Sequence, residues 1–121
     1  GHSEAVCGAA FDPSGALALT ASDDGTAKLW EVAAGECLRT FIGHQGPVSS
    51  AVFSPDGSRM VTATCLRGSQ AKLWEVASGK LVQNFAHLAG VCSAAFSSDG
   101  SMVITGSEDC TAKIWKIPSG E

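Results

Sequence analysis

The phrase WEVAAGE occupies residues 30–36, and it returns as WEVASGK at residues 74–80 and as WKIPSGE at residues 115–121. The tryptophans that open the three phrases lie 44 and 41 residues apart. A self-similar period of this length is typical of repeat architectures, in which each unit buries its apolar surface by stacking on its neighbours. The three phrases therefore predict a chain built from three copies of one unit.

Five further columns keep step with these phrases. They begin with the histidines His2, His44 and His87, and then follow a valine four positions on, a phenylalanine nine on, a glycine thirteen on and a threonine eighteen on. The members are Val6, Val48 and Val91; Phe11, Phe53 and Phe96; Gly15, Gly57 and Gly100; and Thr20, Thr62 and Thr105. The alignment divides the chain into repeats at residues 1–42, 43–85 and 86–121, the last of them incomplete.

Each copy reads as short strands separated by turns. In the first copy the strand-like runs are residues 5–11, 16–22, 26–32 and 36–42, and Pro, Asp and Gly mark the turns between them. No stretch of ten or more residues shows a helical period with caps. Apolar and small residues occupy both parities of the runs, which predicts sheets that are covered on both faces. The expected fold is all-β, with 11 strands in three stacked antiparallel units of four, four and three.

Composition excludes several classes of function. The net charge is −4 and no cluster of Lys or Arg occurs, which argues against nucleic-acid binding. No apolar run reaches the length of a membrane span. The five cysteines include no CxxC pair, so we expect reduced, mostly core residues of a cytoplasmic protein, with no metal site. The nucleus remains an alternative location.

A four-stranded unit of this length, with Gly-His near its start and Trp near its end, resembles the WD repeat. Gly1-His2 and Gly43-His44 match the first pair, and Ala86-His87 stands in the third copy. The family's closing Trp-Asp is here Trp-Glu twice and Trp-Lys once. The resemblance covers essentially the whole chain. It implies stacked β-propeller blades and a non-catalytic scaffold for other proteins or peptides, without a cofactor.

The resemblance also implies one buried hydrogen-bond network per repeat, formed by the His, a strand hydroxyl, a turn Asp and the Trp. Their donors and acceptors can chain without leaving a polar atom unpaired. The implied members are His2, Thr20 or Ser22, Asp24 and Trp30; His44, Thr62 and Trp74; and His87, Thr105 or Ser107, Asp109 and Trp115. Thr20 and Ser22 share a strand face, so the spacing does not choose between them.

The second repeat departs from this pattern. Gly68 stands where the turn Asp would be, and the turn is two residues longer, with Cys65, Leu66 and Arg67 in it. We expect a second network without its carboxylate. The longer loop is either a drifted structural turn or a contact for a partner.

Partners of the family dock on the face that carries the Gly-His turns and the turns between second and third strands. The candidate contacts on that face are Glu4, Asp23, Arg67 and Glu108. Apart from Arg67 they are acidic, which favours a basic or polar peptide, although a solvated rim would look the same.

A catalytic role finds no support in the motifs. The sequence lacks a G-x-S-x-G nucleophile turn and a phosphate-binding loop, and a His, Ser and Asp that recur with a Trp in each repeat fit a structural role. The alternatives to a scaffold are the propeller domain of a larger enzyme and an excised or designed repeat module. The drift between the copies argues against an idealised design.

Closed propellers have four to eight blades. Three copies with WKIPSGE at the end therefore predict either a fragment of a longer propeller or a chain that self-associates, with two copies giving six blades.

Overall fold

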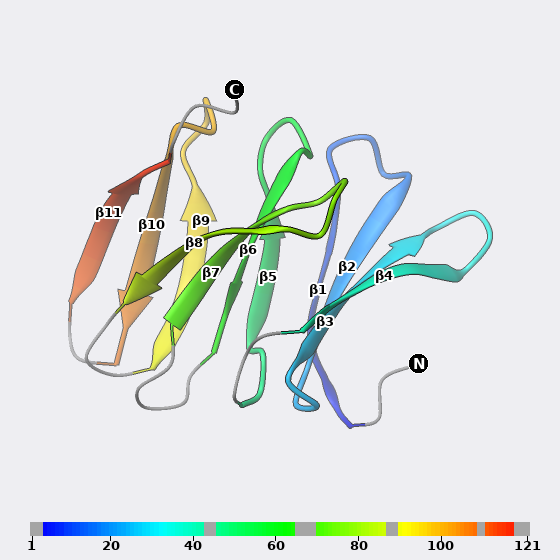
Figure 1. The fold of residues 1–121 in the computed structure, drawn as a ribbon, viewed down its shortest axis with the longest axis horizontal. Coiled ribbons are helices and arrows are strands. Elements are labelled where there is room, and N and C mark those ends of the chain that lie inside the picture. Colours follow the sequence, from blue (N-terminus) through cyan, green and yellow to red (C-terminus); the bar gives the residue numbers. More distant parts are fainter. Residues whose placement is uncertain (1–3, 43–45, 65–69, 87–89, 109–110, 118–121) are drawn as a thin grey trace.

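A computed structural model of the chain describes residues 4–42, 46–64, 70–86, 90–108 and 111–117. Its elements are 11 strands in three antiparallel sheets, which lie side by side in Figure 1. The predicted all-β fold, with sheets of four, four and three strands, is confirmed. Within the described residues there is no helix that could cross a membrane.

Each sheet follows the order of the chain. The first sheet contains β1 (Val6–Phe11), β2 (Leu17–Ser22), β3 (Thr26–Glu31) and β4 (Glu36–Ile42). The second contains β5 (Ser50–Phe53), β6 (Arg59–Ala63), β7 (Gln70–Glu75) and β8 (Leu81–Ala86). The third contains β9 (Val91–Phe96), β10 (Met102–Ser107) and β11 (Ala112–Lys116). The strands of the first sheet match the four runs predicted for it to within one residue at each end.

The glycine column has a backbone cause. Gly15, Gly57 and Gly100 close the turns after the first strand of each sheet, with φ of 76°, 77° and 75°. Residues with a Cβ adopt this left-handed region at a cost, so glycine fixes the place where the chain reverses.

Side-chain hydrogen bonds also close these turns, in two arrangements. In SPDG of the second repeat, the Ser54 hydroxyl accepts a bond from Arg59 N at 3.1 Å and donates to Asp56 Oδ1 at 2.7 Å. In DPSG of the first repeat the two residue types exchange places, and Asp12 Oδ1 takes the bond from Leu17 N at 3.0 Å. A carboxylate and a hydroxyl both accept, so either order closes the turn.

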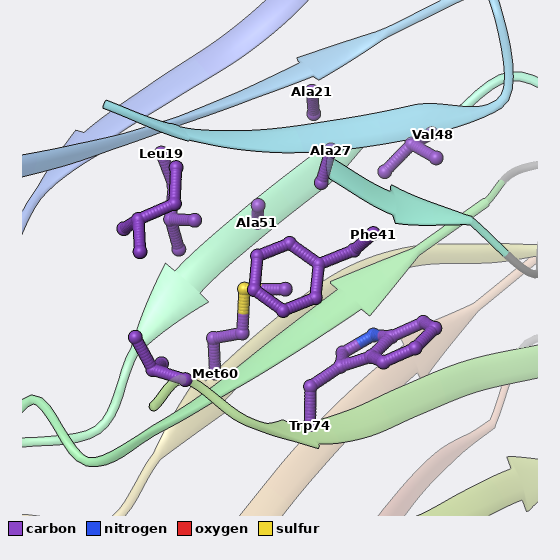
Figure 2. Packing of buried hydrophobic residues seen from close by; sticks show 10 residues of the cluster. Leu19, Ala21, Ala27, Phe41, Val48, Ala51, Met60 and Trp74 are labelled. Atoms are coloured by element: carbon purple, nitrogen blue, oxygen red, sulfur yellow. The ribbon is translucent and has the colours of Figure 1, made fainter. Parts of the chain in front are cut away.

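Two apolar cores separate the three sheets. The core between the first and second sheets contains Leu19, Ala21, Ala27, Leu29, Phe41, Val48, Ala51, Met60, Trp74 and Val76 (Figure 2). The core between the second and third sheets contains Val61, Ala63, Ala71, Leu73, Phe85, Val91, Ala94 and Val103. The second sheet therefore contributes alternate residues of its strands to opposite cores. Burial on both faces explains why small and apolar residues fill both parities of these strands.

An aromatic contact crosses each core. Phe41 packs against Trp74 with ring centroids 5.5 Å apart, and Phe85 packs against Trp115 at 5.0 Å. Each phenylalanine lies on the fourth strand of one sheet and each tryptophan on the third strand of the next.

Polar contacts join the first two sheets at their outer strands. The Arg39 guanidinium on β4 donates from Nη2 to the carbonyl oxygen of Ala77 at 2.8 Å and from Nη1 to that of Ser78 at 3.0 Å. Both carbonyls belong to the turn between β7 and β8. Arg39 therefore clasps the turn of the neighbouring sheet.

Most of the cysteines are expected in the core; the side chains of Cys7, Cys65, Cys92 and Cys110 lie outside the described part of the structure, and Cys37 is not in the core. It is exposed on β4 and forms no disulfide. β4 is the outermost strand of its sheet, and five of its seven residues are exposed because no further strand covers them.

Candidate functional site

The tryptophan of each repeat donates a hydrogen bond to the threonine of the neighbouring strand. Trp30 Nε1 lies 2.8 Å from Thr20 Oγ1, Trp74 Nε1 lies 2.8 Å from Thr62 Oγ1, and Trp115 Nε1 lies 2.9 Å from Thr105 Oγ1. An indole N–H only donates and needs an acceptor when it is buried. The bond satisfies it at the same place in all three sheets, the second repeat included.

The structure therefore distinguishes the two hydroxyls that spacing left open. Ser22, two residues after Thr20, donates its hydroxyl to the carbonyl of Ala5 at 2.9 Å. Ser107 does the same to Gly90 at 2.9 Å. These serines tie the end of the second strand to the segment that precedes the first strand. The threonine hydroxyl accepts the indole N–H, and the serine hydroxyl donates to a backbone carbonyl oxygen.

Asp24 closes the turn between β2 and β3. Its Oδ1 accepts bonds from the backbone N–H of Thr26 at 2.9 Å and from the Thr26 hydroxyl at 2.6 Å, while its own N–H donates to Ser22 Oγ at 3.1 Å. The other expected members of the networks, His2, His44, His87 and Asp109, lie outside the described residues. So do Arg67 and the loop from Cys65 to Gly68.

Three of the candidate contact residues are exposed along one edge of the stack. Glu4, Asp23 and Glu108 are all solvent-exposed. Asp23 N donates to Ala5 O at 2.9 Å, and Glu108 N donates to Gly90 O at 3.0 Å. The same backbone bond thus holds an acidic residue in equivalent positions of the first and third repeats. Glu4 and Asp23 are brought together because both flank the Ala5 carbonyl, whereas Glu108 belongs to a different sheet.

The opposite edge carries a second set of carboxylates, at the turns between the first and second strands. The N–H and then the hydroxyl of Ser58 lower the pKa of Asp56 to about 2, and Ser101 does the same to the pKa of Asp99, also to about 2. The N–H of Leu17 lowers the pKa of Asp12 in the same way. All three are acceptors from fixed donors, which favours the ionised form. These carboxylates are consequently ionised at neutral pH.

The hollows on the described surface include the following two. One, of about 530 Å³, lies between the first and second sheets beside the Arg39 clasp, and it is lined by Leu17, Leu29, Leu38 and Val76 among others. The other, of about 390 Å³, crosses the ends of β1, β5 and β9. Their linings are mostly apolar. In the described part of the chain no three His, Cys, Asp or Glu side chains are grouped to hold a metal ion.

Sequence reasoning missed the contacts that join one sheet to the next. Phe41 and Phe85 each lie eleven positions after the tryptophan of their own repeat, and this spacing was the available signal. Arg39 offered none, because its partners are backbone carbonyls 38 and 39 residues away.

Comparison with known proteins gives these repeats a family. The family model "WD domain, G-beta repeat" matches residues 1–31, 35–75 and 79–116. Its three matches follow the three copies, and the second and third begin at residues 35 and 79, ahead of the starts at 43 and 86 read from the histidine columns.

Several curated proteins are similar over most of the chain. The Lissencephaly-1 homolog of Heterostelium pallidum is 44% identical over 110 residues, which cover 91% of this chain and 26% of the relative. The Target of rapamycin complex subunit LST8 of Rattus norvegicus is 30% identical over 85% of this chain and 32% of its own length. The Transducin beta-like protein 3 of Bos taurus is 32% identical over 98% of this chain and 15% of its own. The chain thus spans a third or less of each of these relatives, and with three sheets, three Trp–Thr bonds and three family matches it belongs to the WD-repeat family.

Proposed function

We propose that the chain is a non-catalytic scaffold that binds other proteins or peptides through the exposed residues of its blade edges. The observation that carries this proposal is an arrangement that recurs along the chain. A Trp–Thr hydrogen bond joins the second and third strands of each sheet, and a backbone hydrogen bond holds the residue that follows the second strand in the first and third repeats. Asp23 and Glu108 stand exposed at the end of that arrangement in the first and third repeats. Rigid strands that present exposed side chains lower the entropy cost of binding.

The charge of this edge indicates the chemistry of the partner. Glu4, Asp23 and Glu108 are acidic and exposed, and the whole chain has a net charge of −4. A basic or polar peptide is therefore the proposed ligand, because complementary charges steer association and exclude acidic competitors. Arg67, in the longer second loop, is proposed as a further contact.

The His, Thr and Trp of each repeat, with Asp24 in the first and Asp109 in the third, are proposed as a structural network and not as an active site. The indole N–H donates to the threonine hydroxyl oxygen in every repeat, and an arrangement that recurs three times in one chain fits a structural role. The chain is accordingly proposed to have no enzymatic activity and no cofactor.

The relatives support an assembly role in one respect. One of them is by name a subunit of a complex. We extend this to the present chain only as a proposal that it works together with other proteins. The three repeats, at 1–42, 43–85 and 86–121, are proposed as units of one domain that also self-associates. The exposed Cys37, which forms no disulfide, supports a reducing compartment such as the cytoplasm.

Binding of a labelled peptide tests the proposal. A fluorescent dodecapeptide with alternating Lys and Ser would be titrated with the chain at low salt, and an alternating Glu and Ser peptide would serve as the reversed-charge probe. The Lys peptide should bind and the Glu peptide should not.

Charge reversal locates the site. The Asp23→Lys and Glu108→Lys double variant should weaken binding of the Lys peptide by about tenfold or more, which corresponds to ~1.4 kcal/mol. Glu36→Lys, an exposed reversal on β4, should change the affinity less than twofold. Equal losses for both variants would indicate attraction by net charge alone and would refute a site at this edge.

A further inference from the structure

The hollow between the first and second sheets has the size and the lining of a ligand site. Its volume is about 530 Å³, and ligand pockets in proteins span about 300–1,000 Å³ with mostly apolar walls. Leu29 and Val76 in its wall are 5% and 6% exposed, whereas Leu38 is 49% exposed. The hollow therefore presents apolar surface that an incoming side chain can cover.

A β-bulge brings two neighbouring side chains of β4 to this hollow. On β3, Leu29 pairs with Arg39 of β4, and the next residue pairs with Cys37. The ladder therefore passes over Leu38. Consecutive residues of a regular strand point to opposite faces, and a bulge re-aims the side chain of its extra residue. As a result, Leu38 and Arg39 both line the hollow.

Two opposite charges border the hollow, and one turn residue contacts both. Arg39 Nη1 donates to the carbonyl oxygen of Ser78 at 3.0 Å, and the hydroxyl of Ser78 donates to Glu75 Oε1 at 2.6 Å. With its further bond to Ala77, Arg39 uses two of the five N–H donors of a guanidinium group. Within the described residues neither charge has an ion-pair partner, so both can bind charged groups of a ligand.

The common fold does not require this lining. The second sheet has the same bulge, where the ladder between β7 and β8 passes over Val82. The side chains around it differ. Leu17, Leu38, Arg39 and Glu75 correspond, one repeat further along the chain, to Arg59, Val82, Gln83 and Lys116. The backbone is therefore shared, whereas apolar walls beside one cation and one anion are particular to the first junction.

We infer that this hollow binds an extended segment of a partner protein in which an apolar side chain lies between an acidic and a basic residue. The apolar side chain fills the hollow, the acidic residue binds Arg39, and the basic residue binds Glu75. A guanidinium group binds a carboxylate through directional, charge-assisted hydrogen bonds. Opposite charges beside an apolar surface select this pattern over a uniformly charged segment, because like charges brought together oppose binding.

This site is separate from the acidic edge proposed above. Gly57 and Ser58 line the hollow and belong to the turn between the first and second strands of their sheet. Asp23 and Glu108 follow the second strands of theirs. The inference therefore adds a contact of different chemistry and does not depend on binding at Asp23 and Glu108.

NMR titration of the 121-residue chain tests the inference. The isotopically labelled chain would be titrated with the acetylated peptide Gly-Ser-Asp-Leu-Lys-Ser-Gly and with the same peptide in which Asp and Lys are exchanged. At least one of them should shift the amide signals of Leu38, Ser58 and Ala77 in a saturable way. Absence of such shifts with both peptides would overturn the inference, and retained binding of the Lys and Ser dodecapeptide would then leave the acidic edge standing.

The leucine of the tighter-binding peptide provides the first control. Its replacement by serine should weaken binding about tenfold or more, because a polar side chain gains nothing from burial in an apolar hollow. Equal binding of the two peptides would show that the hollow is not occupied and would overturn the inference.

Leu38→Ser should weaken binding of the leucine peptide about tenfold or more. Because Leu38 is 49% exposed, its replacement should leave the chain folded, and the dispersion of the amide signals verifies this. Val82→Ser is the matched control, since Val82 is the bulged residue of the next sheet and is 36% exposed. It should change the affinity less than about twofold, and equal losses in both variants would contradict a site at the first junction.

Glu75→Lys tests the charges. It should weaken binding of the leucine peptide about tenfold or more, and a peptide with Asp in place of the Lys should then bind this variant more tightly than the original peptide does. Glu36→Lys makes the same change of net charge on β4, outside the lining of the hollow, and should leave both affinities within about twofold. An equal response of Glu36→Lys would assign the effect to net charge and would overturn the inferred site.

Discussion

The ring of Phe41 meets the indole of Trp74 at an interplanar angle of 61°, with the centroids 5.5 Å apart. Figure 2 shows the phenyl ring from one sheet beside the indole of the next, with Met60 next to both. The same indole donates its N–H to Thr62 within its own sheet. Trp74 therefore contributes to two kinds of contact, because its N–H bonds the neighbouring strand of its own sheet and its ring packs against Phe41 of the preceding sheet.

Phe41→Ala should lower the free energy of unfolding by about 3–5 kcal/mol, since it opens a cavity in a core with no solvent access. Urea unfolding followed by tryptophan fluorescence measures the change. Phe11→Ala is the matched control, because Phe11 is exposed. Its replacement should lower the free energy of unfolding of the monomer by less than about 1 kcal/mol. A similar loss for both would mean that the contact between sheets does not stabilise the fold.

Thr62→Val should lower the free energy of unfolding by about 1–3 kcal/mol, because valine keeps the shape and removes the acceptor of a buried indole N–H. Thermal unfolding monitored by circular dichroism measures the loss. Thr40→Val, at an exposed position on β4, should stay within about 0.5 kcal/mol of the parent chain. Rescue by Trp74→Phe in the Thr62→Val background would identify the unpaired N–H as the cause.

The strands could be predicted because their signals are local. Turn glycines at a fixed place in each repeat and runs of strand formers between them define where every strand of the first sheet begins and ends. The covering of both sheet faces was also visible, since residues such as Met60 and Val61 are neighbours in sequence and both apolar.

The contacts of individual side chains could not be predicted in the same way. Thr20 and Ser22 lie on one strand face, and only the register of β2 against β3 brings Thr20 to the indole of Trp30. The Arg39 side chain reaches from one repeat to the next and donates to backbone carbonyl oxygens. Because every residue has such a carbonyl, no residue type in the sequence signals this contact. The exposure of Cys37 follows from the outermost position of β4, and composition alone does not report it.

Acid should destabilise the fold through the turn aspartates. The pKa of Asp56 is lowered to about 2 from the ordinary 3.8, so its stabilising contribution is complete above about pH 5 and disappears as the pH falls through about 2. The urea midpoint should therefore be steady from pH 8 to 5 and fall below pH 4.

The double variant Asp56→Asn with Asp99→Asn should flatten this decline, since Asp99 has the same lowered pKa. Ser58→Ala should flatten it in part, because it removes the hydroxyl that donates to Asp56 and keeps the backbone N–H. An unchanged acid slope in all variants would assign the decline to other groups.

Gly79 and Gly35 separate the effect of backbone conformation from that of the Arg39 clasp. They occupy equivalent turns, with φ of 74° and 68°. A Cβ at Gly35 meets nothing within 4 Å, whereas a Cβ at Gly79 would lie 2.8 Å from Arg39 Nη1 and 2.9 Å from its Cδ. Gly35→Ala should therefore cost only the left-handed conformation, about 1 kcal/mol.

Gly79→Ala should cost about 1–2 kcal/mol more, because Arg39 must leave the carbonyls of Ala77 and Ser78. In an Arg39→Ala background the two alanine variants should become equal, and urea unfolding of all six chains, the parent included, measures the cycle. A difference that persists without Arg39 would contradict the clasp. Its disappearance would establish that the outer strand of one sheet holds the next through a single guanidinium group.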